Sequence, residues 1–421
     1  MLETQSIREE LAAIVGTANL RAPVAQDAVL GVVPQFIVEP ETEKQLAAAL
    51  SCANNAGLAV IPRGGGTKME WGNRPKRADL ILSTSRLNRI IEHAWADLTV
   101  TVEAGCTLQA LQSALATHGQ RLAFDGLWPE RATIGGVLST NDSGALRLRF
   151  GSLRDLIIGV TIALPDGTLA SSGGKVVKNV AGYDLPKLAT GALGTLGVIT
   201  RAVFRLHPLC PNSRTVAFFA TNWDEMQSKL HAIQDSKLAH SAFQIRAAAG
   251  KVPEANLMFE ATEAGLSAQT ACLRTVLGAT SISETSSLEV WRARENLFAN
   301  LQEHSVVAKI SVLPSEIAKT VQWLDGLHTS AHISWQAIIQ ATGIGFLRLD
   351  ADASTLPKEL TALRAQFERN SGSFVLLHRP EFLRSLDAWG DPGDALPLMR
   401  AVKHRLDGKN TLNPGRFVGG I

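Results

Sequence analysis

The stretch PRGGGTK, residues 62–68, follows directly on the apolar residues 58–61. Three consecutive glycines after a predicted strand leave backbone N–H groups exposed in a tight loop. Such a loop suits a phosphate group, and Arg63 would add positive charge. The dinucleotide pattern G-x-G-x-x-G does not fit, because Met69 stands at its last glycine. A phosphate-binding loop and a plain glycine turn both stay open.

A second block, TIGGVLSTNDSGALRLRFGSLRD at residues 133–155, is crowded with small and polar residues. The part GGVLSTN predicts the start of a helix whose small side chains permit the close approach of a ligand. Asn141 and the neighbouring hydroxyl groups would supply hydrogen-bond donors. An ordinary surface loop has a similar composition, and this alternative also stays open.

A third block, KNVAGYDLPKLATGALGTLGVIT at residues 178–200, places Gly191, Gly194 and Gly197 at every third position before an apolar strand. A tight connection between a helix and a strand would give the same pattern. Residues 133–201 hold seven Lys and Arg against four Asp, a mild excess of positive charge that favours an anionic ligand.

The composition narrows the class of protein. The chain has 421 residues, is 45% hydrophobic and 19% charged, and so is long enough for two or three folded domains. Its net charge of +2 argues against nucleic-acid binding. The four cysteines form no C-x-x-C pair, which argues against zinc, iron–sulfur and disulfide sites and for free thiols in a reducing cytosol. Of the 35 glycines, 22 precede residue 211, so the first half is expected to bind the ligand.

The spacing of apolar residues predicts an α+β protein and not a regular βαβ series. Residues 1–30 read as an irregular amphipathic lead-in, and LIIGVTIALPDGTLA at 156–170 predicts a hairpin around Asp166-Gly167. Residues 211–390 alternate helical and strand-like segments. They predict an α/β domain with an antiparallel sheet and helices on one face. No internal repeat is visible in the sequence.

Together, the three blocks resemble the FAD-binding domain of the vanillyl-alcohol oxidase/p-cresol methylhydroxylase family. The narrower stretch GGKVVKNVAGYDLPKLATGALGTLGVIT, residues 173–200, is similar to the second FAD-binding subunits of bacterial glycolate oxidases. The tail LDGKNTLNPGRF resembles the C-terminal return of that family to the flavin. The implied domains are a lead-in at 1–30, a two-subdomain p-cresol methylhydroxylase-type (PCMH-type) FAD-binding domain at 31–210, a cap at 211–390, and a C-terminal segment at 391–421 that returns to the FAD domain.

Carried onto this sequence, the resemblance implies which residues hold FAD. The amides of Gly64, Gly65, Gly66 and Thr67 would bind the pyrophosphate, and Pro62 and Arg63 would set the turn. The residues implied to line the pyrophosphate and the isoalloxazine are Thr133, Gly135, Gly136, Ser139, Thr140 and Asn141, with Ser143 and Gly144 beside them. The wall on the adenine and ring sides would consist of Gly191, Gly194, Thr195, Gly197, Val198 and Ile199, with Asn413 approaching from the tail.

Several members of the family tether FAD covalently through a histidine in the glycine-rich loop. Thr67 stands at that place here, so the resemblance implies noncovalent FAD. Two charges on a diphosphate can be neutralised by backbone N–H groups without bulky side chains, which agrees with the run of glycines.

The resemblance further implies a subunit of a glycolate oxidase or dehydrogenase complex. The complex would oxidise glycolate, with D-lactate as a second candidate, to the 2-oxo acid. The implied partners are the catalytic FAD-linked subunit and an iron–sulfur subunit that takes the electrons. The implied location is the cytoplasm, with the inner membrane reached only through partner subunits.

Catalytic relatives carry a metal-binding segment H-x-x-G-D-G-N-x-H in the cap, and this sequence contains none. His328 and His332 have the spacing of two ligands on a helix face, but the stretch GLHTSAHISW that holds them contains no acidic residue, so no metal site is predicted. No catalytic residue is assigned. Two alternatives stay open: a stand-alone FAD-dependent 2-hydroxyacid or alcohol dehydrogenase, and a structural subunit that has lost FAD.

Overall fold

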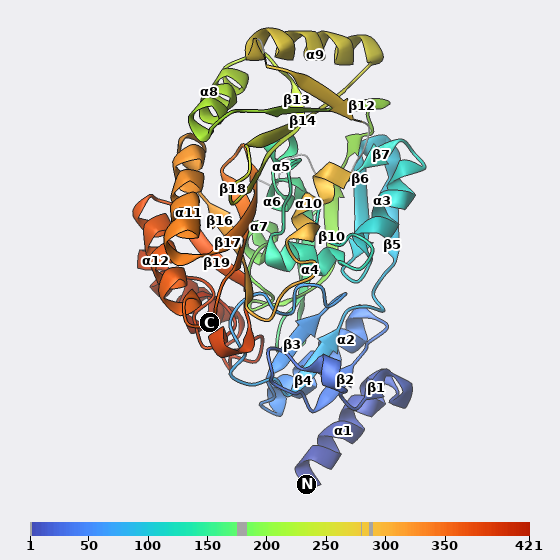
Figure 1. The fold of residues 1–421 in the computed structure, drawn as a ribbon. Coiled ribbons are helices and arrows are strands. Elements are labelled where there is room, and N and C mark those ends of the chain that lie inside the picture. Colours follow the sequence, from blue (N-terminus) through green and yellow to red (C-terminus); the bar gives the residue numbers. More distant parts are fainter. Residues whose placement is uncertain (1, 175–182, 279, 286–288) are drawn as a thin grey trace. The chain divides into compact units, whose positions relative to one another are not determined.

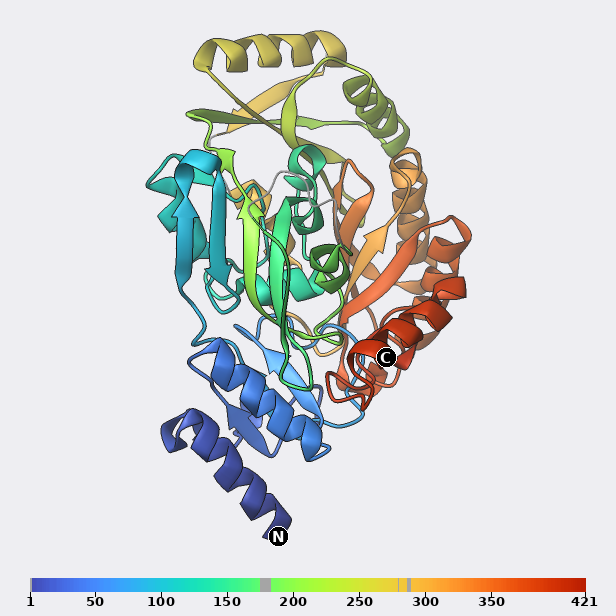
Figure 2. The ribbon, with the colours of Figure 1, turned by 180° about the vertical axis from the view of Figure 1, so that it is seen from behind.

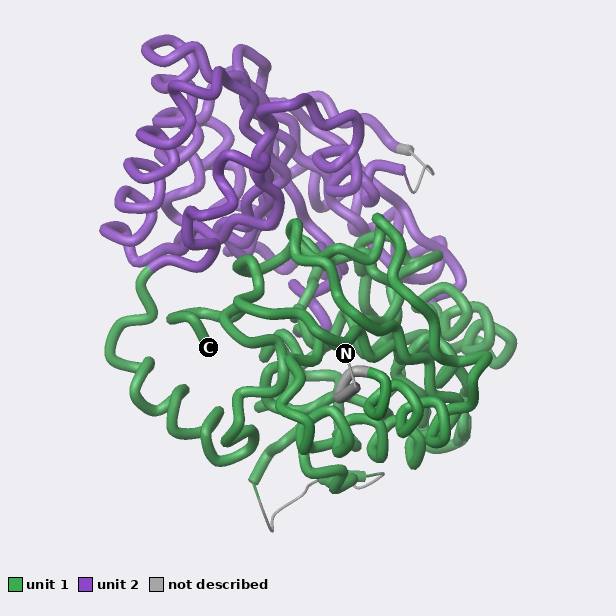
Figure 3. Tube along the Cα trace, turned by 90° about the horizontal axis from the view of Figure 1, so that it is seen from below, with its two compact units in different colours: residues 1–143, 152–209, 391–421 green, residues 144–151, 210–390 purple. Residues whose placement is uncertain are grey.

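The computed structural model describes four stretches of the chain, residues 2–174, 183–278, 280–285 and 289–421. They divide into two units (Figure 3). Unit 1 comprises residues 1–143, 152–209 and 391–421. Unit 2 comprises residues 144–151 and 210–390. The glycine blocks at 62–68 and 191–197 and the C-terminal tail therefore all lie in unit 1.

The N-terminal lead-in contains a helix, α1 (Leu2–Val15). The prediction of an irregular structure over residues 1–30 is therefore wrong for the first half of that segment. Leu11 and Val15 are buried, and they join an apolar cluster with Leu46 and Leu50 of helix α2 (Glu43–Asn55). Apolar residues three to four positions apart are the usual sign of such a helix. Helix α1 thus shares one buried apolar cluster with α2 and with strands of the first sheet.

Four short strands form the first sheet of unit 1 (Figure 1), in the order β1 (Leu20–Arg21), β2 (Phe36–Val38), β4 (Leu80–Ser83) and β3 (Val60–Arg63). Strand β4 runs parallel to both β2 and β3, and α2 makes the crossover from β2 to β3. Because β3 and β4 are parallel neighbours, the residues that follow them emerge at the same edge of the sheet. That edge carries the glycine loop.

The second sheet of unit 1 is antiparallel and has five strands, in the order β5 (Ile90–Ala94), β6 (Thr99–Glu103), β10 (Val198–Arg205), β8 (Ile157–Ala163) and β9 (Leu169–Gly173). Strands β8 and β9 form the predicted hairpin, and Gly167 in its turn has a φ of +89°. The helices that complete this region are α3 (Leu108–Ala116), α4 (Ile134–Thr140), α6 (Leu153–Leu156) and α7 (Leu185–Ala189). A small pair, β7 (Gln120–Arg121) with β11 (His207–Pro208), lies beside them.

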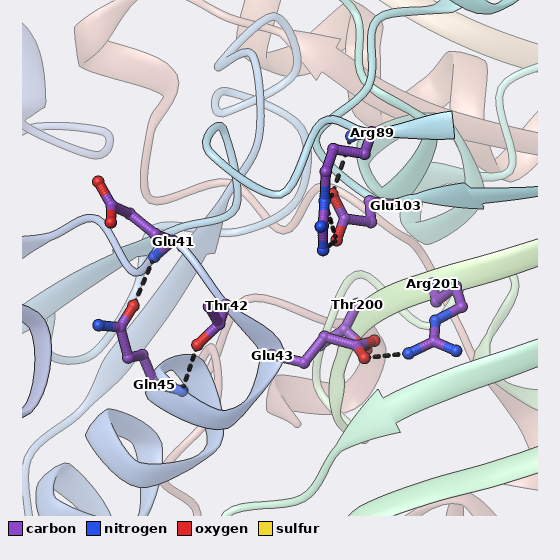
Figure 4. Close-up of polar contacts among 8 residues, drawn as sticks. All are labelled: Glu41, Thr42, Glu43, Gln45, Arg89, Glu103, Thr200 and Arg201. Atoms are coloured by element: carbon purple, nitrogen blue, oxygen red, sulfur yellow. Dashed lines mark hydrogen bonds and ion pairs between the residues drawn. The ribbon is translucent and has the colours of Figure 1, made fainter. Parts of the chain in front are cut away.

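The first turn of α2 ties the two sheets together (Figure 4). The carboxylate of Glu43 accepts a hydrogen bond from the hydroxyl of Thr200 at 2.7 Å and pairs with the guanidinium of Arg201, both on β10. On the neighbouring strand, the buried carboxylate of Glu103 accepts the amide of Arg89 at 2.8 Å. The sheet that presents the glycine loop is thus fixed against the sheet that presents the third glycine block.

Unit 2 is built on one antiparallel sheet of eight strands, as predicted (Figures 1 and 2). Its strands are, in order, β15 (Ile282–Thr285), β12 (Asn212–Phe219), β14 (Glu254–Ala261), β13 (His240–Ala248), β17 (Ser334–Gln340), β18 (Ile344–Asp350), β16 (Ser305–Ser311) and β19 (Ser373–His378). The helices that share one buried cluster with this sheet are α8 (Trp223–Gln234), α9 (Glu263–Leu277), α11 (Ile317–Ala331) and α12 (Leu356–Arg369). Two short helices, α5 (Arg147–Phe150) and α10 (Ala293–Asn296), complete the unit.

Unit 2 contains a structural repeat that the sequence does not reveal. The order β12-α8-β13-β14-α9-β15 recurs as β16-α11-β17-β18-α12-β19, and each half arranges its strands in the same spatial order. The halves join where β13 pairs with β17, with Gln244 opposite Gln340. The expectation of no internal repeat therefore holds for the sequence and is wrong for the fold. A sheet and its helices constrain which positions are apolar, not which residues fill them.

The tail that follows helix α13 (Leu396–Leu406) returns to the first sheet of unit 1, which confirms the prediction. Leu412 forms a parallel bridge with Val60 on β3. The amide of Val60 donates to the carbonyl of Thr411 at 2.7 Å, and the amide of Asn413 donates to the carbonyl of Val60 at 2.9 Å. The tail therefore extends the sheet on the far side of β3.

A buried ion pair holds this tail in place. The ammonium of Lys403 pairs with Asp407 at 2.6 Å and donates to the carbonyls of Thr195 and Leu412, each at 2.9 Å. Asp407 is almost wholly buried, and its carboxylate also accepts the amides of Thr411 and Leu412. Burial lowers the pKa of Lys403 below its usual value, although Asp407 opposes this effect.

Candidate functional site

A pocket in unit 1 opens at the carboxyl ends of β3 and β4. Its described lining contains most of the residues that the sequence assigned to FAD. They are Pro62, Arg63, Gly64, Gly65, Gly66, Thr67, Thr133, Gly135, Gly136, Ser139, Thr140, Gly194, Gly197, Val198, Ile199 and Asn413. The three glycine blocks and the tail, far apart in sequence, therefore meet around one cavity.

The first wall is the loop at residues 64–67, where glycine is required by space. A Cβ on Gly64 would overlap the hydroxyl of Thr133, and a Cβ on Gly65 would overlap the carbonyl oxygen of Arg131. Within the part of the chain that the structure describes, the amides of Gly64, Gly66 and Thr67 donate no hydrogen bond to another protein group. Such amides suit the oxygens of a diphosphate.

The second wall is helix α4. Its residues Gly135, Gly136, Ser139 and Thr140 line the pocket. Gly135 is packed against β6, because a Cβ at this position would lie 2.9 Å from the Cβ of Ala104 at the end of that strand. The helix has no bulky side chain toward the pocket among these positions, so a ligand can lie close to its backbone.

The third wall joins the block at 193–199 to the C-terminal tail. The side-chain amide of Asn413 donates to the carbonyl of Leu193 at 2.6 Å, and a Cβ on Gly194 would lie 3.2 Å from the same amide. The guanidinium of Arg416 donates to the carbonyls of Met69 and Trp71 at 2.6 and 2.8 Å. The tail therefore holds both the third block and the end of the glycine loop.

Arg63, which precedes the glycines, is fixed by a buried carboxylate. Asp27 pairs with Arg63 at 2.7 Å and with Arg21 at 2.6 Å, and it accepts the amide of Val24. These donors, with Arg21 the strongest, hold the pKa of Asp27 well below its usual range, although burial opposes the effect. The turn into the phosphate loop thus depends on a charged Asp27.

We expect Asp27→Asn to lower the stability of the protein by about 2 kcal/mol at neutral pH, because the ion pairs with Arg21 and Arg63 are both lost. A carboxyl group with a lowered pKa in the folded state stabilises the protein above its unfolded pKa, 3.8, and loses this effect as the pH falls through the folded pKa. The difference between parent and variant should therefore shrink below about pH 4. Urea unfolding at pH 7, 5 and 3 measures it, with the exposed Asp97→Asn as control. If the stability difference between the parent and Asp27→Asn were the same at all three pH values, the lowered pKa of Asp27 would be contradicted.

Five residues that the sequence assigned to FAD lie outside the described lining of the pocket. Gly191 and Asn141 pack against each other and close the end of α4, since the Gly191 amide donates to the carbonyl of Leu138. Thr195 is buried and its carbonyl accepts Lys403, and Ser143 is buried as well. Gly144 belongs to unit 2.

The structure also adds pocket residues that the sequence reasoning did not select: Lys68, Met69, Thr84, Leu193 and Arg416. Thr84 follows β4 directly, so the parallel pairing of β3 and β4 could have indicated it. Lys68 and Arg416 stand inside the quoted stretches PRGGGTK and LNPGRF, but nothing in the sequence shows that their side chains are buried.

The described residues were also compared with what a metal site and a membrane-spanning helix require. No group of three or more His, Cys, Asp or Glu with a geometry for a metal ion occurs among them. His328 lies on α11, whereas His332 ends that helix with a φ of +53°. No helix in the same stretches is long and apolar enough to cross a membrane.

Comparison with known proteins indicates the cofactor of this chain. Residues 34–173 match the family model of an FAD binding domain. The D-2-hydroxyglutarate dehydrogenase of Xanthomonas citri pv. viticola is 27% identical and aligns over 91% of this chain and 89% of its own length. The glycolate oxidase subunit GlcD of Bacillus subtilis is 29% identical over 56% of this chain and 52% of its own length. The crystal structure of p-cresol methylhydroxylase with bound substrate has a TM-score of 0.80 at 16% identity, over 99% of this chain and 97% of that one.

The protein therefore has the PCMH-type FAD-binding fold, and its cofactor is FAD. The pocket fits this cofactor, because the loop packs on Thr133 and Arg131 too closely for a side chain at Gly64 or Gly65 and so presents bare backbone amides to an anion. FAD supplies the redox chemistry when it is bound, and the chain supplies binding, orientation and electrostatics. The loop at 64–67, the face of α4 and Asn413 would hold it.

Proposed function

We propose that this chain is the FAD-binding subunit of a glycolate oxidase or dehydrogenase complex that oxidises glycolate, with D-lactate as a second candidate, to the 2-oxo acid. The observation that carries the proposal is the FAD pocket, which is assembled from all three glycine blocks and the tail. The names of two relatives, a D-2-hydroxyglutarate dehydrogenase and a glycolate oxidase subunit, support a 2-hydroxy acid as the electron donor.

Membership of a complex is supported by the sequence. The stretch at 173–200 resembles the second FAD-binding subunits of bacterial glycolate oxidases, although its residues 175–182 lie outside the described ones. The metal-binding segment of catalytic relatives does not occur in the sequence. Under the proposal, the catalytic FAD-linked partner removes the substrate protons and an iron–sulfur subunit accepts the electrons. The complex works in the cytoplasm and meets the inner membrane through its partners.

The FAD of this chain is proposed to be noncovalent, since Thr67 lines the pocket where related proteins carry a tethering histidine. Precipitation of the protein with acid tests this point. Yellow supernatant is expected, and flavin that stays in the protein pellet would contradict it.

A second candidate is a stand-alone FAD-dependent 2-hydroxyacid dehydrogenase. It is favoured by the alignment with D-2-hydroxyglutarate dehydrogenase, which extends over 91% of this chain and so includes unit 2. A structural subunit that has lost FAD is disfavoured, because the glycine loop at Gly64 and Gly65 still has the close packing that only glycine allows.

One experiment separates these functions. The purified chain is loaded with FAD, and its visible absorbance is followed without oxygen after addition of glycolate, D-lactate or D-2-hydroxyglutarate. The proposal expects no bleaching of the chain alone and bleaching after the two partner subunits are added. Bleaching of the chain alone would contradict the proposed subunit function and favour the stand-alone dehydrogenase. A chain that takes up no FAD would contradict both functions.

A further inference from the structure

A buried lysine lies at the end of the phosphate loop. The side chain of Lys68 is 5% exposed, and its ammonium lies 3.5 Å from a carboxylate oxygen of the fully buried Asp142. The same ammonium lies 5.6 Å from the ring centre of Trp71 and 5.4 Å from that of Trp128. We call these four residues the lysine cage. All of them belong to unit 1.

Two features of the lysine cage, its buried charges and a strained backbone, are unfavourable in free energy. Removing an ammonium and a carboxylate from water carries a large desolvation penalty for each group, and their mutual attraction only partly offsets it. Trp128 has a φ of +54°, a conformation that is strained for a bulky side chain. Its carbonyl accepts the amides of Arg131 and Ala132, so the strained residue starts the turn that leads into α4. Strain of this kind is typical of functional sites.

The two charged residues of the lysine cage are placed differently with respect to the pocket. Lys68 lines the FAD pocket, whereas Asp142 is not among the described lining residues and is engaged by the amide of Leu127 at 2.8 Å. Lys68 is therefore the member of the pair that borders the pocket, and its ammonium is itself buried. The two indole rings keep water away from it, and a charge acts more strongly where water is excluded.

We propose that Lys68 is a positioning residue that strengthens the binding of FAD through its dianionic diphosphate. Asp142 balances the charge and fixes the ammonium, and the cation–π contacts with Trp71 and Trp128 hold the side chain in place. The amides of the glycine loop then bind the diphosphate next to a fixed cation. The inference concerns cofactor binding and does not depend on which substrate is oxidised.

The test removes the charge and measures binding to the protein freed of FAD. Lys68→Met keeps an apolar stem between the two rings. FAD, ADP and riboflavin are titrated by calorimetry or flavin fluorescence, because ADP has the diphosphate without the flavin and riboflavin has the ring without the diphosphate. We expect the Kd of FAD and of ADP to rise tenfold or more, with little change for riboflavin. Lys68→Arg should restore most of the affinity.

Two controls separate charge from folding. Lys409→Met removes a lysine elsewhere in unit 1, whose ammonium donates to the carbonyl of Asn54, and should bind all three ligands like the parent. The double variant Lys68→Met/Asp142→Leu leaves no unpaired carboxylate, so it should fold even if the single variant does not, and it should show the same loss. Affinity for FAD and ADP within twofold of the parent in a folded variant, or an equal loss for all three ligands, would overturn the proposal.

Discussion

Gly65→Ala is expected to abolish the binding of FAD. A Cβ at this position would overlap the carbonyl oxygen of Arg131, a backbone atom that cannot rotate away. The loop would have to move as a whole, and its amides would then no longer converge on the diphosphate. We expect the affinity for FAD to fall at least a hundredfold, about 2.7 kcal/mol of binding free energy.

The measurement is the flavin content of the purified variant together with a titration of its FAD-free form. Gly326→Ala is the matched control, because no atom lies within 4 Å of a Cβ built at this helical position. It should bind FAD like the parent and gain up to about 1 kcal/mol of stability, since alanine favours a helix over glycine. Parental FAD content in Gly65→Ala would show that the loop does not hold the cofactor.

Lys403→Met is expected to lower the stability of the protein by about 3–5 kcal/mol, because it leaves the buried Asp407 without its cation. The ammonium also bridges the carbonyls of Thr195 and Leu412, so its loss removes one of the contacts between the tail and the third glycine block. Asn413, on the next position, lines the FAD pocket. Weaker FAD retention should therefore accompany the lower stability.

Urea unfolding and the release of FAD on gel filtration measure the two effects. The exposed Lys44→Met on α2 serves as control and should change stability by less than about 0.5 kcal/mol. Lys403→Met/Asp407→Leu should recover much of the stability, because an apolar pair can replace a buried ion pair. An unchanged midpoint in Lys403→Met would mean that the tail does not depend on this pair.

The sequence predicted best those features that depend on neighbouring residues. The hairpin at Asp166-Gly167 and the alternation of helical and strand-like segments over 211–390 follow from turn residues and apolar spacing, and both are found. The loop at 64–66 was selected as a candidate for phosphate binding because consecutive glycines leave backbone N–H groups exposed, and the sequence alone left a plain glycine turn equally open. The return of the tail came only from the resemblance, since no local signal in LNPGRF indicates a partner on β3.

The parts that the sequence did not predict depend on distant residues. Lys68 stands inside the stretch PRGGGTK, yet its burial depends on Trp128 and Asp142, about sixty and seventy residues away in the sequence. Helix α1 was missed although Leu11 and Val15 have helical spacing, because the face that buries them belongs to α2.

The seating of the tail beside β3 has a consequence for biosynthesis. A ribosome completes the loop at 64–67, α4 and the block at 191–199 well before it reaches Asn413, and all of residues 210–390 are made in between. A nascent chain therefore presents two walls of the cofactor pocket, and part of the third, long before the tail can close it. Stable capture of FAD is thus a late event, and chains that stall before the tail should be recovered without their cofactor.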